Sequence, residues 1–248
     1  MSHTPPLPPN AAMRWSIVRR FVQRLTPASI LEIGCGQGAF GARLARRADY
    51  LAVEPDPTSF AVAKRRIEAV GGKVRNTSSD ELEGGATFDL VCAFEVLEHL
   101  PDDRQALASW RGLVRPGGHI LLSMPAWQER FNAWDTMVGH YRRYSPEQCR
   151  AALTDTGFDQ VEVVLYGWPL GFVTERLRSR IAARRGVAAD SGDEAMQLRT
   201  ASSGRTLQPK AIAGVAVWAA TAPFSGLQRL RPDRGTGVVV VARRPLDG

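Results

Sequence analysis

An apolar segment that runs directly into a glycine-rich turn is the feature that most restricts the fold of this chain. Residues 30–38 read Ile-Leu-Glu-Ile-Gly-Cys-Gly-Gln-Gly, so a buried strand is followed by glycines at every second position. Glycine permits positive φ angles and lets a ligand approach the backbone closely. A helix expected over 39–47 would direct its free N–H groups toward the same turn. The segment therefore predicts a strand–turn–helix unit that binds a nucleoside-containing cofactor.

The turn alone leaves the type of cofactor open. Residues 36–41 read Gly-Gln-Gly-Ala-Phe-Gly, which also satisfies the dinucleotide-binding pattern G-x-G-x-x-G. Glu54 follows at about the distance expected for an acid that binds a ribose. A nicotinamide-dependent dehydrogenase is therefore one alternative at this point.

Strand and helix patterns alternate through the first half of the chain. Residues 10–25 carry apolar side chains at helical spacing with arginines between them, which predicts an amphipathic helix. Strands are expected near 29–33, 50–54, 72–76, 88–93, 118–124, 161–166 and 238–242. Regular alternation of this kind predicts an α/β fold with a doubly wound, mostly parallel sheet. Ser145, Pro146 and Gln148 form the pattern of a capping box at the start of a further helix.

Four blocks in the chain resemble, in order and spacing, those of the class I S-adenosylmethionine (SAM) methyltransferases. The blocks are Leu-Glu-Ile-Gly-Cys-Gly-Gln-Gly at 31–38, Val-Glu-Pro-Asp at 53–56, Phe-Asp-Leu-Val with Glu-Val-Leu-Glu-His across 88–99, and Arg-Pro-Gly-Gly at 115–118. The resemblance implies a seven-stranded Rossmann-like sheet whose last strand runs antiparallel between the fifth and sixth. It also implies SAM as the cofactor and S-adenosylhomocysteine as the product.

The same resemblance suggests how the chain is divided. Residues 1–9 are expected to be a flexible N-terminus, 10–166 the SAM-binding core, 167–234 a helical cap inserted before the last strand, and 235–248 that strand and the tail. The insertion is too long for a plain loop. Helices are expected in it at 171–185 and 211–230, with a polar, mobile stretch between them at 186–209 that would act as a lid.

The residues expected to bind the cofactor lie at the ends of the predicted strands, where open α/β sheets bind ligands. Glu54 can accept both ribose hydroxyls, and the glycines allow close approach. The resemblance places the methionine part beside Glu32, Ala93, Phe94 and Glu95. It places the adenine beside Pro55 and Asp56, with its amino group near Ser79 and Asp80. The predicted set is Glu32, Gly34, Cys35, Gly36, Gly38, Glu54, Pro55, Asp56, Ser79, Asp80, Ala93, Phe94 and Glu95.

Methyl transfer needs in-line alignment above all, and a base only if the acceptor must lose a proton. His99, His140 and Glu95 are the candidate catalytic residues, because histidine titrates near neutral pH and all three follow predicted strands. The residues expected to contact the acceptor are Trp134, Tyr141, Arg142, Arg143 and Trp168.

The block Glu-Val-Leu-Glu-His at 95–99 raises a metal-dependent alternative. Its spacing resembles that of methyltransferases that modify the 3′-terminal 2′-hydroxyl of small RNAs, in which two acids and two histidines hold Mg²⁺ or Mn²⁺. His140 would be the second histidine. The block is also common in metal-free members, so we predict no metal and keep metal-dependent RNA 2′-O-methylation as an alternative.

Charge and cysteine content bear on partners and compartment. The net charge is +7, with a cluster of arginines over 176–185 that we interpret as a solvated helix face, or alternatively as contacts to an anionic substrate or lipid headgroup. The three cysteines lack metal-binding spacing, which favours a reducing cytoplasm. The N-terminus lacks the pattern of a signal peptide, and no transmembrane helix is expected.

Together these observations predict a SAM-dependent methyltransferase acting on a small or amphipathic acceptor. A hydroxyl is the expected methyl acceptor, in a molecule of natural-product, quinone, saccharide or lipid type. A non-methylating SAM-binding protein is the second alternative. Peripheral membrane contact through the basic cap is an alternative to the solvated helix face, and nucleic acid is not a predicted partner.

Overall fold

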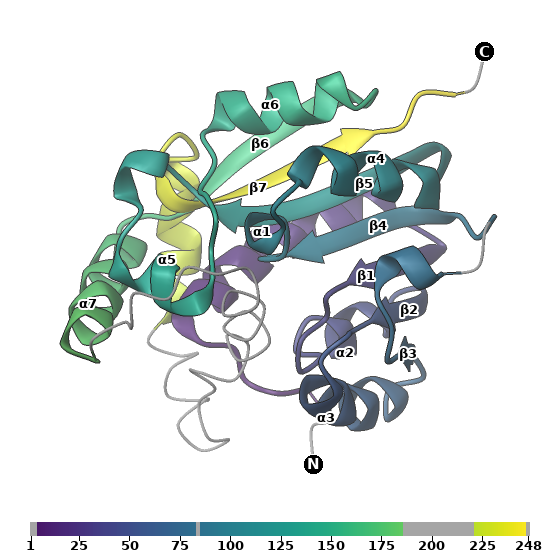
Figure 1. The fold of residues 1–248 in the computed structure, drawn as a ribbon, viewed down its shortest axis with the longest axis horizontal. Helices are drawn as coiled ribbons and strands as arrows, with labels where there is room; N and C mark the ends of the chain where they lie inside the picture. Colours follow the sequence, from purple (N-terminus) through teal and green to yellow (C-terminus); the bar gives the residue numbers. More distant parts are fainter. Residues whose placement is uncertain (1–3, 83–84, 186–220, 247–248) are drawn as a thin grey trace.

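Seven strands form one sheet in the order β3-β2-β1-β4-β5-β7-β6 in the computed structural model, which describes residues 4–82, 85–185 and 221–246 (Figure 1). The strands are β1 (Ser29–Ile33), β2 (Asp49–Val53), β3 (Lys73–Arg75), β4 (Phe88–Phe94), β5 (Val114–Pro125), β6 (Asp159–Gly167) and β7 (Gly235–Arg243). β7 pairs antiparallel with both β5 and β6, whereas the other pairs are parallel. The predicted fold class is confirmed.

Helices cover both faces of the sheet. They are α1 (Pro9–Leu25), α2 (Gly41–Leu44), α3 (Pro57–Glu68), α4 (Asp103–Leu113), α5 (Ala133–Val138), α6 (Pro146–Asp155) and α7 (Leu170–Arg185), with short 3₁₀ turns η1 (Ser79–Glu81), η2 (Leu97–His99), η3 (Gln128–Arg130) and η4 (Gln228–Leu230). α1 and α3 contribute to one hydrophobic core cluster, and α4 and α6 to the other. Leu90 and Val91 of β4 belong to opposite clusters and are both fully buried. Strands buried on both faces read as continuous apolar runs, as β4 does.

Two segments differ from the expected secondary structure. The helix expected over 39–47 shortens to α2, because its last turn closes with a 3₁₀-type bond from Arg47 N–H to the Leu44 carbonyl at 2.8 Å. The stretch 126–144 has no periodicity in the sequence but contains α5. Asn132 caps that helix, accepting the Trp134 N–H at 3.0 Å, while Asp135 accepts the Asn132 N–H at 2.9 Å. A six-residue helix is too short to produce a readable period.

The predicted capping box at the start of α6 is confirmed. The Ser145 hydroxyl accepts the Gln148 N–H at 3.2 Å, and the Gln148 side chain accepts the Ser145 N–H at 2.8 Å. Within the N-terminal segment that is predicted to be flexible, Leu7 is buried and the Pro5 carbonyl accepts a hydrogen bond from Arg43 at 2.7 Å.

Part of the predicted cap is described by the structure. α7 agrees with the helix expected over 171–185, and residues 221–227 are helical. The predicted lid at 186–209 and most of the helix expected at 211–230 lie outside the described residues. Within the described part of the chain, no helix combines the length and apolar character needed to cross a membrane.

The carboxyl ends of β4 and β5 point toward α5 and α7, which lie beyond the same edge of the sheet (Figure 1). β7 runs in the opposite direction and therefore begins at that edge. Side chains from the strand ends, from α5 and from α7 consequently meet in one place.

Candidate active site

The glycine turn after β1 has the backbone that the sequence predicted. Gly34, Gly36 and Gly38 have φ angles of +67°, +55° and +74°, in the region that favours glycine. A Cβ on Gly36 would meet no atom within 4 Å, so open space lies beside the turn. A Cβ on Gly34 would lie 2.8 Å from the Val96 side chain. A side chain at Gly34 would therefore clash with the protein, whereas the space beside Gly36 is open to a ligand.

Glu54 follows β2 and is almost fully buried beside this turn. One carboxylate oxygen accepts the Gly36 N–H at 2.7 Å, and the other accepts the Asp56 N–H at 3.0 Å. Burial raises the pKa of Glu54, and these two hydrogen bonds oppose the shift. A carboxylate offers about four acceptor positions. Glu54 thus keeps acceptor capacity for the two hydroxyls of a ribose, which fits the nucleoside of SAM.

Glu32 lies in β1 and is also buried, where the Tyr50 hydroxyl donates a hydrogen bond to it. Burial raises the pKa of the Glu32 carboxyl to about 7, although Tyr50 and the charge of Arg14 act in the opposite direction. Glu32 therefore changes charge near neutral pH in the unliganded chain.

This shift predicts a pH dependence of stability. Because the folded pKa of Glu32 lies above the unfolded value, ionisation of Glu32 removes stability as the pH rises from about 4.5 to about 7, by about 3 kcal/mol. We expect Glu32→Gln to gain stability relative to the wild type between about pH 5 and about pH 8, as measured by urea unfolding at both values. Glu68→Gln, at an exposed position of α3, is the control. A Glu32→Gln difference that is the same at both pH values would contradict the prediction.

The remaining predicted cofactor residues lie in three places. Cys35, Ala93 and Phe94 are buried at the ends of β1 and β4, beside the turn. Asp56 caps α3 by accepting the Ser59 N–H at 2.9 Å, and Pro55 is exposed.

Ser79 and Asp80 lie in η1 and contact α4 instead. Ser79 accepts a hydrogen bond from the Trp110 indole at 3.3 Å, and Asp80 accepts one from the Ser109 hydroxyl at 3.4 Å. Their contact with adenine stays a prediction.

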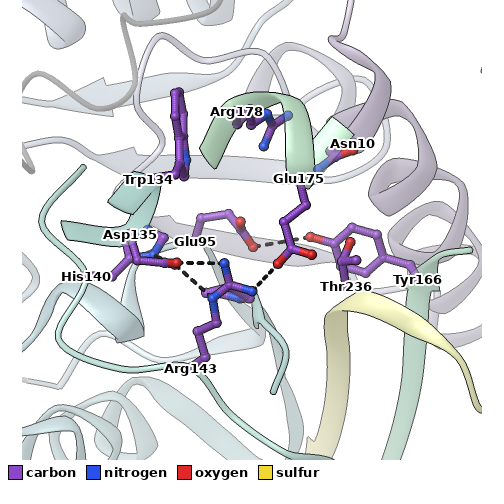
Figure 2. Close-up of a pocket in the computed structure, with 11 residues that line it drawn as sticks. Asn10, Glu95, Trp134, Asp135, His140, Arg143, Tyr166, Glu175, Arg178 and Thr236 are labelled. Atoms are coloured by element: carbon purple, nitrogen blue, oxygen red, sulfur yellow. Dashed lines mark hydrogen bonds and ion pairs between the residues drawn. The ribbon is translucent and has the colours of Figure 1, made fainter. Parts of the chain in front are cut away.

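A cavity of about 60 Å³ lies where β4, α5 and α7 meet (Figure 2). Its lining residues are Asn10, Glu95, Pro125, Trp134, Asp135, His140, Arg143, Tyr166, Glu175, Arg178 and Thr236. Ligand pockets usually measure about 300–1,000 Å³. This cavity is therefore smaller than a typical ligand pocket.

Glu95, directly after β4, is one of the acidic residues that line this cavity. It has a φ of +58° and pairs with Arg14 of α1 at 2.8 Å. The hydroxyls of Ser123 and Tyr166 donate to it at 3.2 Å and 3.4 Å. Burial alone would raise the pKa of Glu95, but the charge of Arg14 opposes burial, and the pKa is held below the usual value. Glu95 is therefore held ionised by its neighbours and is poorly suited to accept a proton.

His140 is oriented by a buried ionic network. Its Nδ1 lies 2.8 Å from Asp135 Oδ1, and Asp135 also accepts hydrogen bonds from Arg143 at 2.9 Å and 2.6 Å. Arg143 pairs in addition with Glu175 of α7 (Figure 2). A carboxylate on Nδ1 keeps the proton on that nitrogen and leaves Nε2 to accept another. The geometry is that of an oriented general base.

His99 and Glu98 both lie close to His140. The His99 ring centroid is 4.6 Å from that of His140, and its Nδ1 lies 3.0 Å from the Gly139 carbonyl oxygen. Burial and the neighbouring His140 lower the pKa of His99 to about 3, so it is neutral at pH 7. Glu98 is fully buried, and its pKa is raised well above the usual value by burial and by the charge of Glu95.

Two of the five residues predicted to contact the acceptor line the cavity, namely Trp134 and Arg143. Arg142 instead pairs with Asp103 at 3.0 Å. Tyr141 and Trp168 are absent from the cavity lining formed by the described residues. The Arg143 guanidinium is occupied by Asp135 and Glu175, so its part in acceptor binding stays a prediction.

Sequence reasoning missed several lining residues. Asn10 and Glu175 showed no local pattern, and Asp135 lies in the stretch without periodicity. Arg178 belongs to the cluster that we interpreted as a solvated face, yet it lines the cavity with its guanidinium 5.6 Å from the Trp134 ring. Among the described residues, no hydrogen bond or ion pair joins the Arg178 guanidinium to another side chain. No local pattern separates Arg178 from the other arginines of the cluster, because its contact with Trp134 joins α7 to α5.

A family model described as a methyltransferase domain matches residues 11–163, more than half of the chain. A ubiquinone biosynthesis O-methyltransferase of Methylocella silvestris is 43% identical over 93 residues, which cover 36% of this chain and 36% of that protein. The chain thus spans well under two thirds of the length of the curated relatives that it matches.

Solved structures with the same fold have low sequence identity. Phosphoethanolamine N-methyltransferase 2 of Haemonchus contortus, solved with SAM, superposes with a TM-score of 0.57 at 21% identity, covering 93% of this chain and 53% of that one. The [4+2]-cyclase SpnF superposes with a TM-score of 0.53 at 18% identity, covering 94% and 82%. The family match disfavours the dehydrogenase alternative, and the chain belongs to the methyltransferase domain family, as its resemblance to the class I SAM-dependent methyltransferases implies.

Proposed function

We propose that this chain transfers a methyl group from SAM to a hydroxyl of a small or amphipathic acceptor. The observation that carries the proposal is the position of His140, which lines a cavity at the carboxyl end of β4 and is oriented by the buried carboxylate of Asp135. The glycine turn and Glu54 lie along the same edge of the sheet, at the ends of β1 and β2.

SAM supplies an activated methyl group when it is bound, so the work of the chain is to bind and orient. Gly36 leaves open space beside its backbone, and Glu54 keeps acceptor capacity for a ribose diol. Alignment of an acceptor oxygen with the methyl carbon and the sulfur supplies about 7–11 kcal/mol of the barrier in well-oriented reactions.

His140 gives the proposal its preference for a hydroxyl. As the acceptor oxygen bonds to the methyl carbon, the carbon–sulfur bond breaks and sulfur keeps the electron pair. The hydroxyl proton must leave in the same step, and with Nδ1 bonded to Asp135 the Nε2 of His140 is the nitrogen left to receive it. The name of the Methylocella silvestris relative agrees with transfer to oxygen.

Arg178 and Trp134 favour an acceptor that carries an anionic group. The guanidinium of Arg178 lines the cavity, whereas the other cavity arginine, Arg143, is paired with two carboxylates. A carboxylate or phosphate on the acceptor would supply the charge-assisted partner that Arg178 lacks among the described residues.

Replacement of Glu54 tests the cofactor half of the proposal. We expect Glu54→Ala to weaken SAM binding by about 2–3 kcal/mol, because a buried diol loses its charged acceptor. Calorimetric titration with SAM, S-adenosylhomocysteine and NADH measures this loss. Some thermal stability is lost as well, since Glu54 accepts two backbone N–H groups.

Glu68→Ala, at an exposed position of the neighbouring helix α3, is the matched control and should bind SAM as the wild type does. Unchanged SAM affinity in folded Glu54→Ala would refute the assignment of Glu54. Tight binding of NADH by the wild type, with no response to SAM or its product, would refute the proposed function itself.

A further inference from the structure

Glu98 is the most unusual buried group in the described part of the chain. Its side chain is fully buried, and neither carboxylate oxygen accepts a hydrogen bond from another described residue. A buried carboxylate without a partner costs several kcal/mol, and such groups are rare unless they pair or coordinate a metal. Both oxygens of Glu98 are therefore left without a hydrogen-bond donor among the described residues.

Two imidazoles face this carboxylate. One nitrogen from each of His99 and His140, together with an oxygen of Glu98, lie within 4.8 Å of one another. The Glu98 Oε1 to His140 Nε2 distance is 3.8 Å, too long for a hydrogen bond. Two atoms that ligate one divalent cation at about 2.1 Å lie about 3–4 Å apart. The separation suits a shared cation better than a direct contact.

The outer contacts of both histidines are those of metal ligands. His140 Nδ1 lies 2.8 Å from the Asp135 carboxylate, and His99 Nδ1 lies 3.0 Å from the Gly139 carbonyl oxygen. Metal-bound histidines almost always donate the other ring N–H to a carboxylate or a backbone carbonyl, which fixes the tautomer and aims the second nitrogen. Here both second nitrogens are Nε2.

We propose that Glu98, His99 and His140 bind a divalent transition-metal cation. Two imidazoles and one carboxylate leave coordination positions open and favour Mn²⁺, Fe²⁺ or Zn²⁺ over Mg²⁺ or Ca²⁺, which take oxygen ligands. Glu95, the other acid of the Glu-Val-Leu-Glu-His block at 95–99, pairs with Arg14 at 2.8 Å and is not one of the three proposed ligands.

The site deepens the proposed function and rests on it for its catalytic role. His140 lines the acceptor cavity, so a cation on its Nε2 borders that cavity. Such a cation lowers the pKa of a hydroxyl that reaches it. With a cation bound, the hydroxyl proton would pass to water and His140 would act as a ligand; without one, His140 Nε2 would accept the proton as proposed above.

Binding is tested on the full chain after dialysis against a chelator, without SAM or acceptor. Calorimetry with ZnCl₂ and electron paramagnetic resonance with MnCl₂ should each show one equivalent bound, with a rise in the unfolding temperature. Glu98→Gln should weaken binding at least about 10-fold, and His99→Gln is a second variant at a less buried position. Glu129→Gln, exposed in η3, is the matched control and should bind as the wild type does.

Two results would overturn the site: no stoichiometric binding of either ion by the folded wild type, or equal binding by both ligand variants. Methyl transfer that proceeds undiminished in chelator would overturn its catalytic role and leave the proposed function intact. Stoichiometric binding in a chain that methylates no acceptor would support the site while removing the proposed function.

Discussion

Replacing His140 with glutamine is expected to slow methyl transfer by about 10²–10⁴-fold while SAM affinity stays within a small factor of the wild type. The side chain lines the cavity and is aimed by Asp135, whereas the glycine turn and Glu54 hold the nucleoside elsewhere along the sheet edge. The loss follows whether Nε2 takes the acceptor proton itself or holds a cation that acidifies the hydroxyl. Single-turnover transfer and calorimetry measure the two quantities separately.

His119→Gln is the control for this experiment, because His119 lies in β5 outside the described lining of the cavity. It should transfer the methyl group at the wild-type rate. A folded His140→Gln variant that keeps the full rate would remove His140 from the chemistry and leave alignment alone as the source of catalysis. Loss of SAM affinity equal to the loss of rate would show that His140 acts on the cofactor site instead.

Replacing Asp135 with alanine is expected to cost about 3–5 kcal/mol of unfolding free energy, the largest stability effect we expect from a single charged residue. Asp135 is fully buried and accepts hydrogen bonds from Arg143 and from His140. Without it, Glu175 is the one carboxylate partner left to the buried Arg143 among the residues that the structure describes. Urea unfolding of the variant at neutral pH measures the cost.

The pH dependence supplies a second signature of Asp135. Burial would raise its pKa, but hydrogen bonds from His140 and Arg143 outweigh burial and lower it. Its stabilising contribution is therefore present above the unfolded pKa of about 3.9 and is lost as the pH falls through the lower, folded value. The difference between wild type and variant should shrink in acid. Asp155→Asn, which breaks an exposed pair with Arg104, should change stability little at any pH, and an equal effect of the two variants would contradict the account.

Local sequence predicted the cofactor side of the site well, for a physical reason. The glycine turn and Glu54 each follow a buried strand, and the ends of neighbouring parallel strands meet at one edge of the sheet. Gly34, Gly36 and Gly38 have positive φ because the turn is defined within a few residues. For this turn, the structure has the backbone that the local sequence predicted.

The acceptor side could be predicted only in part, because its partners are joined by the fold. Arg14 lies in α1, where spacing shows only an amphipathic helix, yet it reaches Glu95 at the far end of β4. Asp135 lies in a short capped helix without a readable period. Glu175 and Arg178 lie in α7, within the insertion that the family resemblance does not cover. His140 was predicted, but the carboxylate that orients it was not.

The central claim is tested most directly by incubating the purified chain with SAM that carries a trideuterated methyl group. Small hydroxylated acceptors, both neutral and carboxylated, are offered, and the products are weighed by mass spectrometry. Our account predicts that an acceptor gains one trideuteromethyl group on oxygen, that a carboxylated acceptor is preferred, and that His140→Gln abolishes most of the gain. A chain that binds SAM tightly but transfers the label to no acceptor, in the presence or absence of added Mn²⁺ or Zn²⁺, would contradict it and favour a non-methylating SAM-binding protein.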